Sequence, residues 1–344
     1  MGQSMGYLTR SVWVRTILGL VVASALLALV LLRTDLGATV DALGEANFAY
    51  LPPAALVFAV AVWFQALRWR YLLKPLADVS ASRLYPVVWV GHFANSLVPL
   101  RAGEVLRALV VNRREGVSRM ATLGTLVVER ALDGLALTTM LLVFVAVVDS
   151  SSRLWQLVVA GTLLFGLATA VLILIALHPE RSLSLGTRFI DRGPVRFRSR
   201  LRRWLRSFLT GTRALRTPGG IAAALLTTAA FWLSVALVYA IVGEAFDIQE
   251  GFGTYLLVTA AANLSVSIPS SQGGLGPFEF FVRETLVFSG VASPVATAYA
   301  LVLHATILVT MIVIGAFCLR TAGLSLDMLR EDSPVDDEEE TAAL

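Results

Sequence analysis

Long apolar stretches alternate with short polar stretches along this chain. Six of the apolar stretches have about the 20 residues that a helix needs to cross the hydrocarbon core of a bilayer. They are residues 13–32, 51–67, 121–148, 154–177, 221–242 and 294–319. The pattern therefore predicts a bundle of membrane-spanning helices. We interpret residues 13–32 as an uncleaved first helix, because no clear small-residue cleavage site follows them.

Two further apolar segments, residues 84–112 and 255–288, are broken in their middle by prolines and glycines. Proline removes a backbone donor from a helix, and glycine allows close backbone approach. Paired interruptions at matching places in two halves of a chain indicate the central binding site of a transporter. We expect each broken segment to form a helical hairpin.

Basic residues indicate how the spans are oriented, because cytoplasmic loops carry an excess of lysine and arginine. Arg68, Arg70 and Lys74 follow the second span, and eleven arginines lie between Arg181 and Arg216. The loops on the other side of the membrane carry acidic residues instead. The rule places both termini and the loop 178–219 in the cytoplasm. Residues 84–112 must then enter and leave the membrane from the cytoplasm, and residues 255–288 from outside.

The fold prediction is all-α: a polytopic membrane protein with about six spanning helices and two re-entrant hairpins in an inverted repeat. The halves are residues 11–149 and 153–320, within one transmembrane domain over residues 1–330. Arg130 lies fourteen residues after Gly116, and His304 lies fourteen residues after Gly290, which supports the repeat. The alternative is that each hairpin limb spans fully, which gives ten crossings. We expect the acidic tail 331–344 to be disordered.

Within the loop 178–219, apolar residues alternate with arginines over residues 195–209. The spacing suits an amphipathic helix that lies on anionic cytoplasmic lipid. The alternative is that these arginines only set the topology.

Composition supports a membrane protein. The chain is 57% hydrophobic and 15% charged, whereas a soluble domain carries about 25% charged residues. The net charge is +4, but the arginines collect in short loops, which indicates topology rather than nucleic-acid binding. The single Cys318 excludes an intrachain disulfide. No catalytic or metal-binding motif is present, so we expect neither an enzyme nor a cofactor or metal.

The span 121–148 contains three ionisable residues, Glu129, Arg130 and Asp133. Unpaired, they would cost about 8–10 kcal/mol to insert, so they must be paired or hydrated. Their spacing of three and four residues suits one helix face. One interpretation is an internal salt-bridge cluster that pins the hairpin to this span. The other is a charged lining for the path of a polar headgroup, and both can hold.

Each interruption supplies candidate binding groups. The first contains Asn95, Pro99, Arg101, Gly103, Glu104 and Arg107. A half-helix that begins near Ala102 favours an anion, and arginine suits phosphate. The alternative for Glu104 is that it only complements the helix dipole. The second interruption contains Asn263, Pro269, Ser270, Gln272, Gly273, Gly274, Gly276 and Glu279, with Pro277 suited to start the next half-helix. His304 could titrate near neutral pH, or could simply be a packed donor.

These motifs resemble the lysylphosphatidylglycerol synthase transmembrane family, also called the flippase-like domain family, from about Trp13 to Arg320. The resemblance is carried by residues 95–107, 128–133 and 268–279. In the family's bifunctional members this domain moves an aminoacylated phospholipid between leaflets, and a separate domain synthesises that lipid. We expect no synthase domain here. His304 stands where the family often has Arg or His, whereas Ser271 and Gln272 depart from its usual pattern.

The predicted function is that of a flippase or scramblase-like transporter in the plasma membrane. It would move an anionic phospholipid, an aminoacyl-phospholipid or a polyprenyl-phosphate-linked lipid through a central polar cavity. Arg101, Arg107 and Arg130 would hold the phosphate. Asn95, Ser270, Gln272 and Glu279 would contact the rest of the headgroup, and Glu104, Glu129 and Asp133 would balance the charge. Movement would be passive or ion-coupled, with Glu104, Glu279 and His304 as proton candidates.

Two other functions stay open: a membrane-embedded transferase acting on a lipid-linked substrate, and a scaffold that moves no lipid. Membrane lipids with phosphate-containing headgroups are the expected partners, and nucleic acid is not. A separate lipid-synthesising enzyme and a second copy of the chain are partners that the sequence leaves open.

Overall fold

The computed structural model describes residues 21, 23–30, 32–97, 102–148, 153–193, 195–265 and 272–321. Regular structure in these residues is helical throughout, which confirms the all-α prediction. The α-helices are α2 (Leu36–Glu45), α3 (Leu51–Leu73), α4 (Ala81–Leu97), α5 (Ala102–Glu115), α6 (Arg119–Val148), α7 (Arg153–Leu177), α8 (Pro179–Ile190), α9 (Val195–Gly211), α10 (Pro218–Glu244), α11 (Phe252–Ser265), α12 (Pro277–Phe288) and α13 (Ser293–Thr321). Three short 3-10 turns are η1 (Phe48–Tyr50), η3 (Arg213–Arg216) and η4 (Gln272–Gly274).

The predicted spans from residue 51 onward correspond to α3, α6, α7, α10 and α13, whereas residues 13–32 lie only partly within the described chain. Three described helices are long and apolar enough to cross a membrane: Phe48–Leu73, Pro218–Glu244 and Ser293–Thr321. The second part of α7 meets α8 at 104°, and counting this bent pair as one span gives four. Helix α6 is 30 residues long but carries three ionisable residues in its middle. The total of six spans stays a prediction.

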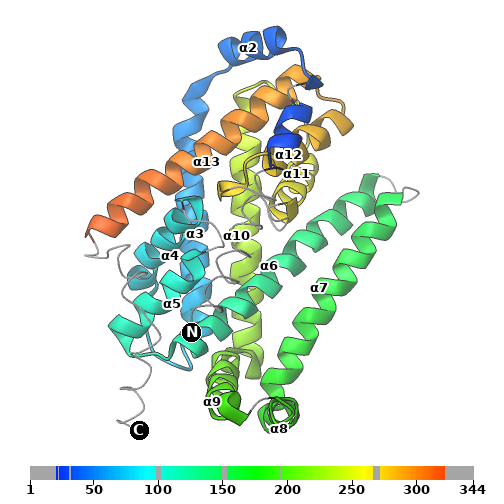
Figure 1. The fold of residues 1–344 in the computed structure, drawn as a ribbon. Helices are drawn as coiled ribbons and strands as arrows, with labels where there is room; N and C mark the ends of the chain where they lie inside the picture. Colours follow the sequence, from blue (N-terminus) through cyan, green and yellow to red (C-terminus); the bar gives the residue numbers. More distant parts are fainter. Residues whose placement is uncertain are drawn as a thin grey trace.

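Helices α3 and α10 pack along each other at the centre of the molecule (Figure 1). Alanines lie fully buried on both, at Ala54, Ala61 and Ala66 of α3 and at Ala224 and Ala236 of α10. Small residues let helix backbones approach closely, which is how helices associate in lipid.

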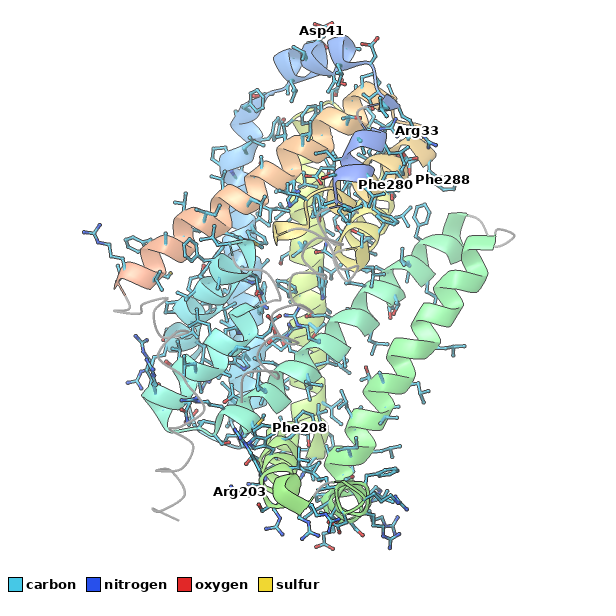
Figure 2. All side chains as sticks on the ribbon, in the orientation of Figure 1. Arg33, Asp41, Arg203, Phe208, Phe280 and Phe288 are labelled. Carbon is cyan, nitrogen blue, oxygen red and sulfur yellow. The ribbon has the colours of Figure 1, made fainter. Side chains whose placement is uncertain are left out.

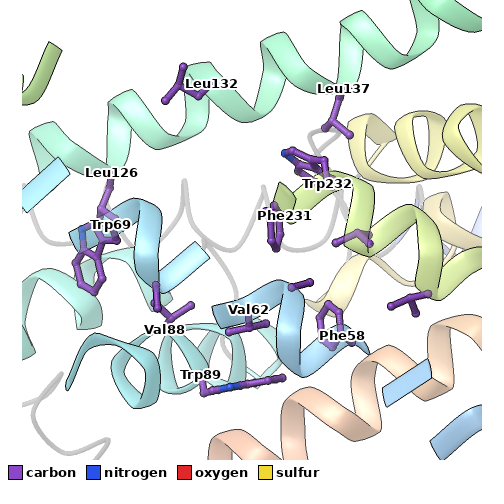
Figure 3. Close-up of a cluster of buried hydrophobic side chains, with 14 of the residues drawn as sticks. Phe58, Val62, Trp69, Val88, Trp89, Leu126, Leu132, Leu137, Phe231 and Trp232 are labelled. Atoms are coloured by element: carbon purple, nitrogen blue, oxygen red, sulfur yellow. The ribbon is translucent and has the colours of Figure 1, made fainter. Parts of the chain in front are cut away.

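Larger side chains fill the space around this contact, as Figure 3 shows. Trp69 of α3 and Trp89 of α4 are fully buried, and Phe231 and Trp232 of α10 are nearly so. Phe58 meets Trp89 edge to face, with ring centroids 5.8 Å apart. Such pairs add to the burial of the rings themselves. The core therefore joins α3, α4 and α10 into one body.

Both predicted interruptions are present as helix breaks. Helix α4 ends at Leu97 and packs against α5, which begins at Ala102. Helix α11 ends at Ser265 and packs against α12, which begins at Pro277 as predicted. Pro99, Arg101, Pro269 and Ser270, which we predicted as site residues, lie outside the described residues.

Each hairpin leads into its next long helix through a glycine in the left-handed region. Gly116 has φ 66° and precedes α6, and Gly290 has φ 102° and precedes α13. The packing of the two halves is reciprocal: α6 packs against α11, and α13 packs against α4. Figure 1 places α4 and α5 beside the lower half of α3, and α11 and α12 beside the upper half of α10.

The acidic and the arginine-rich surfaces lie at opposite ends of the molecule. Figure 2 shows Asp41 of α2 at one end and Arg203 of α9 at the other. Helix α9 covers the predicted amphipathic segment and packs against α6. That contact is close, because a Cβ atom added at Gly124 would lie 2.6 Å from the Phe208 carbonyl oxygen. The arginine-rich end is thus fixed to the helix that carries Glu129, Arg130 and Asp133.

Candidate functional site

Ionisable side chains gather where α3, α5 and α6 meet, against α10. We call this group the charge cluster; its members are Arg68 of α3, Arg107 of α5, and Glu129, Arg130 and Asp133 of α6. All but Arg130 are at most 6% exposed. The cluster therefore confirms that the charges of α6 are paired.

Glu129 is the acceptor at the centre of the charge cluster. Arg107 donates to it through both terminal nitrogens, Nη1 to Oε1 at 3.0 Å and Nη2 to Oε2 at 3.1 Å. This fork geometry is the strongest form of an arginine–carboxylate pair. Gln65 Nε2 of α3 also donates to Oε1, at 2.9 Å. Glu129 thus ties α6 to both α3 and α5.

Asp133 makes the second set of contacts, one helical turn further along α6. Arg68 Nη1 donates to its Oδ1 at 2.6 Å, and Trp232 Nε1 of α10 donates to the same oxygen at 3.0 Å. Arg68 also donates to Thr228 Oγ1 at 3.1 Å and lies 3.4 Å from Glu129 through Nη2. These contacts join α3, α6 and α10.

Arg130 differs from the other members, because 43% of its side chain is exposed. Its Nη2 lies 3.1 Å from Glu129 Oε1 and its Nη1 lies 3.6 Å from Asp133 Oδ2. A guanidinium has five N–H donors, so donors are left for a ligand on the exposed side. Arg130 is the member of the charge cluster that can reach one.

The charges of the cluster balance, but its hydrogen-bond donors are not all used. Three guanidinium groups face Glu129 and Asp133, and Glu104 of α5 lies close enough to act electrostatically on Arg130, so the formal sum is 3 − 3 = 0. Within the part of the chain that the structure describes, Arg68 Nε and Arg107 Nε find no hydrogen-bond acceptor. The Arg107 guanidinium instead lies over the Trp69 ring, 4.1 Å from its centroid. The cluster has more donors than acceptors.

The first hairpin is closed by Asn95 at the end of α4. Its Oδ1 accepts from Gly103 N at 2.8 Å, and its Nδ2 donates to Glu104 Oε2 at 3.3 Å. A Cβ atom at Gly103 would lie 2.1 Å from the Gly91 carbonyl oxygen, so the two limbs touch through backbone. Asn95, Gly103 and Glu104, all predicted site residues, therefore set the shape of the hairpin beside the charge cluster.

Sequence reasoning misassigned Arg68 and missed two neighbours. We grouped Arg68 with the loop residues that orient the chain, which was wrong, because α3 continues to Leu73 and Arg68 is fully buried. Gln65 is buried too, and His92 Nε2 of α4 lies 2.8 Å from Gln65 Oε1. The signal was available: Gln65 and Arg68 are three residues apart and so share a helix face.

A second polar group lies at the other hairpin and centres on His304 of α13. His304 Nδ1 lies 2.7 Å from Glu279 Oε1, and its Nε2 lies 3.0 Å from the Gly273 carbonyl oxygen. Glu279 Oε2 accepts from Gly276 N at 2.7 Å. His304 is 4% exposed and Glu279 is 3% exposed. The Phe278 ring packs on the imidazole, with centroids 4.2 Å apart.

The glycines of this hairpin have the backbone freedom that the sequence indicated. Gly273, Gly274 and Gly276 have φ values of 71°, 80° and 93°. Side chains rarely adopt this region, so the turn depends on glycine. Gln272 opens the η4 turn, which packs against α4 of the first hairpin. The two interrupted segments therefore meet.

Asn263, by contrast, joins neither polar group. Its Nδ2 donates to Tyr239 OH of α10 at 3.1 Å and to the Thr259 carbonyl oxygen at 2.8 Å. These bonds hold α11 to α10 and make Asn263 a packing residue in this structure.

Arg283 of α12 is a buried cation that sequence reasoning did not single out. It is 4% exposed and donates to Ser293 Oγ at 2.5 Å, Thr297 Oγ1 at 3.2 Å and the Arg33 carbonyl oxygen at 3.1 Å. It also pairs with Glu284. The guanidinium thereby connects α12, α13 and the segment before α2. These contacts are structural, and they do not indicate that Arg283 binds a ligand.

A cavity of about 450 Å³ lies between the N-terminal end of α4 and the C-terminal end of α5, and none of its lining residues belongs to the charge cluster. Its lining includes Arg83, Arg114 and Glu115. The charge cluster itself is filled by its own side chains. Arg130 is therefore the most accessible ion of the cluster, and reaching the other members would require the ion pairs to exchange partners.

Comparison with known proteins agrees with the resemblance in the sequence. The family model described as the lysylphosphatidylglycerol synthase TM region matches residues 16–315. A curated protein named Glycosyltransferase AglD, from Haloferax volcanii, is 30% identical over 121 residues, which is 35% of this chain. The match spans only 19% of that protein's length. No solved structure matches the chain.

Proposed function

Because this chain belongs to the lysylphosphatidylglycerol synthase transmembrane family, we propose that it moves a phosphate-bearing anionic lipid between the leaflets of the membrane. The observation that carries the proposal is the charge cluster, in which Arg130 is half exposed and keeps N–H donors beyond its contacts with Glu129 and Asp133. A lipid phosphate would accept from these donors.

Energetics favour an anionic ligand over a neutral one. Arg130 is already paired with Glu129 and Asp133, but its guanidinium keeps further N–H donors on the exposed side. An ionised phosphate oxygen accepts such a donor about twice as strongly as a neutral oxygen does, and it suits the fork geometry of the guanidinium. The carboxylates of Glu129 and Asp133 hold the remaining arginines in place. The acyl or prenyl tails would stay in the surrounding bilayer.

The proposed path runs between two re-entrant hairpins that enter from opposite sides. Reciprocal packing of α6 on α11 and of α13 on α4 supports an inverted repeat. The opposite ends of the molecule, acidic at α2 and arginine-rich at α9, support cytoplasmic placement of α8 and α9. On this topology both termini are cytoplasmic, and we propose the plasma membrane as the protein's location.

Reconstitution tests the proposal directly. Vesicles containing the protein and a fluorescent phosphatidylglycerol or polyprenyl phosphate are treated with a quencher that reaches only the outer leaflet. We expect Arg130→Gln to slow lipid movement at least tenfold and Arg70→Gln, the same change at a surface arginine of α3, to leave it unchanged. Wild-type rates in a folded Arg130→Gln protein, for every lipid tried, would contradict the proposal.

A membrane-embedded transferase is the second candidate, and the name of the archaeal relative favours it. That relative is called a glycosyltransferase, but the similarity reaches only a fifth of its length. The discriminating measurement is donor consumption: purified protein is incubated with a polyprenyl phosphate and a nucleotide sugar. Transfer of the sugar without any added enzyme would favour the transferase over the transporter.

A further inference from the structure

The second hairpin places a histidine between two hydrogen-bond acceptors. The Gly273 carbonyl oxygen can only accept, so His304 Nε2 must donate to it across the 3.0 Å that separates them. A neutral imidazole has one donor nitrogen and one acceptor nitrogen. With Nε2 as the donor, Nδ1 of a neutral ring would be an acceptor, and it faces Glu279 Oε1 at 2.7 Å.

That short contact therefore requires one more proton than a neutral histidine and an ionised carboxylate provide. The proton resides either on Nδ1, which gives an imidazolium beside a carboxylate, or on Glu279, which gives a carboxylic acid that donates to Nδ1. In both forms the pair has no net charge. Without the proton, a carboxylate would face a ring lone pair inside a buried site.

We infer that Glu279 and His304 form a proton-binding site whose occupied state holds the second hairpin against α13. The bound proton closes a continuous chain of contacts from Gly273 through His304 and Glu279 to Gly276 N. These are the glycines whose left-handed backbone shapes the turn. On release the proton passes to water and the neutral ring keeps one N–H. The Glu279 carboxylate is the stronger acceptor for that N–H, so the contact with Gly273 is lost and the turn is freed from α13.

The surroundings leave Glu279 as the charged partner of His304 among the described residues. Helix α10 contributes Tyr239, whose ring lies 6.2 Å from that of Phe278. On α4, His92 is bonded to Gln65. Further along α12, Arg283 is bonded to the far end of α13 and to the segment before α2. On α3, Arg68 is paired with Asp133. The acids of α2, such as Asp41, lie on the exposed end of the molecule.

This site deepens the proposed function, on which its role as a coupling site rests. A turn that is held or freed by one proton, and that packs against α4 of the other hairpin, can couple lipid movement to a proton gradient. The proton site itself stands on the hydrogen-bond geometry and can be tested without measuring transport.

Two substitutions imitate the two states of the Glu279–His304 pair, one the proton-occupied state and the other the proton-free state. In Glu279→Gln the amide NH₂ can donate to Nδ1 and the amide oxygen can accept from Gly276 N, which imitates the proton-occupied pair at every pH. In His304→Leu no donor to Gly273 exists, which imitates the released turn. Both variants are made in a Cys318→Ala background, which removes the single cysteine.

A spin label at Leu275→Cys, in the turn and 46% exposed in the native protein, reports the state in lipid nanodiscs. We expect the wild-type label to be immobilised at mildly acidic pH and mobile at alkaline pH. The label should be immobilised throughout in Glu279→Gln and mobile throughout in His304→Leu. A label at Phe288→Cys, at the other end of α12, is the control and should not respond.

A wild-type spectrum that does not change with pH, or a Glu279→Gln spectrum that changes as the wild type does, would overturn the inference. The spin label needs no lipid movement. A pH-dependent turn in a protein that moves no lipid would therefore reject the proposed function and keep the proton site.

Discussion

At the scale of single residues, the charge cluster contains buried ions that depend on one another. Arg68 is fully buried, and Asp133 is its closest carboxylate, at 2.6 Å. Removing one partner of a buried pair leaves the other charge without compensation, whereas removing both is far less costly. Stability and lipid binding should therefore be separable within the cluster, since Arg130 is half exposed and Arg68 is not.

We predict that Asp133→Asn destabilises the protein by about 3–5 kcal/mol, because it leaves Arg68 buried without its main counter-ion. The double variant Arg68→Met with Asp133→Asn should recover a large part of that loss. Unfolding in detergent, followed by circular dichroism against temperature or denaturant, measures both. If Asp133→Asn unfolds with the same free energy as the wild type, the pair contributes nothing to folding.

The sequence indicated that the ions of α6 are paired and that they could hold the first hairpin, as Arg107 and Glu129 do, but it did not indicate the partner on α3. Glu129, Arg130 and Asp133 had to be paired, because a membrane interior does not tolerate isolated charges. Their partner Arg68 follows directly after the predicted span 51–67. The orientation rule interprets an arginine at such a position as a cytoplasmic loop residue, not as a buried ionic partner. A side chain is buried by the helices that pack on it, and the local sequence pattern does not show which helices those are.

At the scale of elements, the first hairpin depends on contact between the backbones of α4 and α5. Gly91 and Gly103 face each other, and Asn95 closes the open end. We predict that Gly103→Ala costs about 1–3 kcal/mol through overpacking and slows lipid movement, because a Cβ atom would lie 2.1 Å from the Gly91 carbonyl oxygen.

Gly166→Ala in α7 is the matched control, since a Cβ atom there meets nothing within 4 Å. It should leave stability and transport as they are, or raise stability slightly through better helix propensity. The same unfolding and vesicle measurements apply to both variants. A tolerated Gly103→Ala would mean that α4 and α5 separate easily and that their contact is not what shapes the site.

Apolar length and breakers predicted the existence of nearly every long helix and of both interruptions, and Pro277 predicted the start of α12. The sequence did not predict the 104° bend between α7 and α8. The local signal there is Pro179, and proline is common at the first position of any helix, so it does not indicate a bend. Nor could it show that α9 packs on α6 through Gly124, since that contact depends on the path of the whole chain.

At the scale of the whole molecule, the two halves have similar packing and different chemistry. The first hairpin lies beside paired arginines, one of them half exposed, and the second lies beside a histidine–glutamate pair. The packing of η4 against α4 joins these regions. This division suits a protein in which one hairpin binds an anionic headgroup and the other responds to a proton.

That arrangement requires each hairpin tip to stop inside the membrane, and labelling of single cysteines can test it. In a Cys318→Ala background, Asp41→Cys should react with an impermeant maleimide from outside and Arg203→Cys from the cytoplasm. These residues mark the two ends of the molecule (Figure 2). Leu97, at the end of α4, is 48% exposed, so Leu97→Cys is free to react wherever water and reagent reach it.

If α4 and α5 form a re-entrant hairpin, Leu97→Cys should react with the outside reagent much more slowly than Asp41→Cys, because the tip ends short of the outer surface. If α4 and α5 each cross the bilayer, as in the arrangement with ten crossings, the two cysteines should react from outside at similar rates. A 17-residue helix such as α4 is about 26 Å long, close to the thickness of the hydrocarbon core, so its length cannot decide between these arrangements and the labelling rate can.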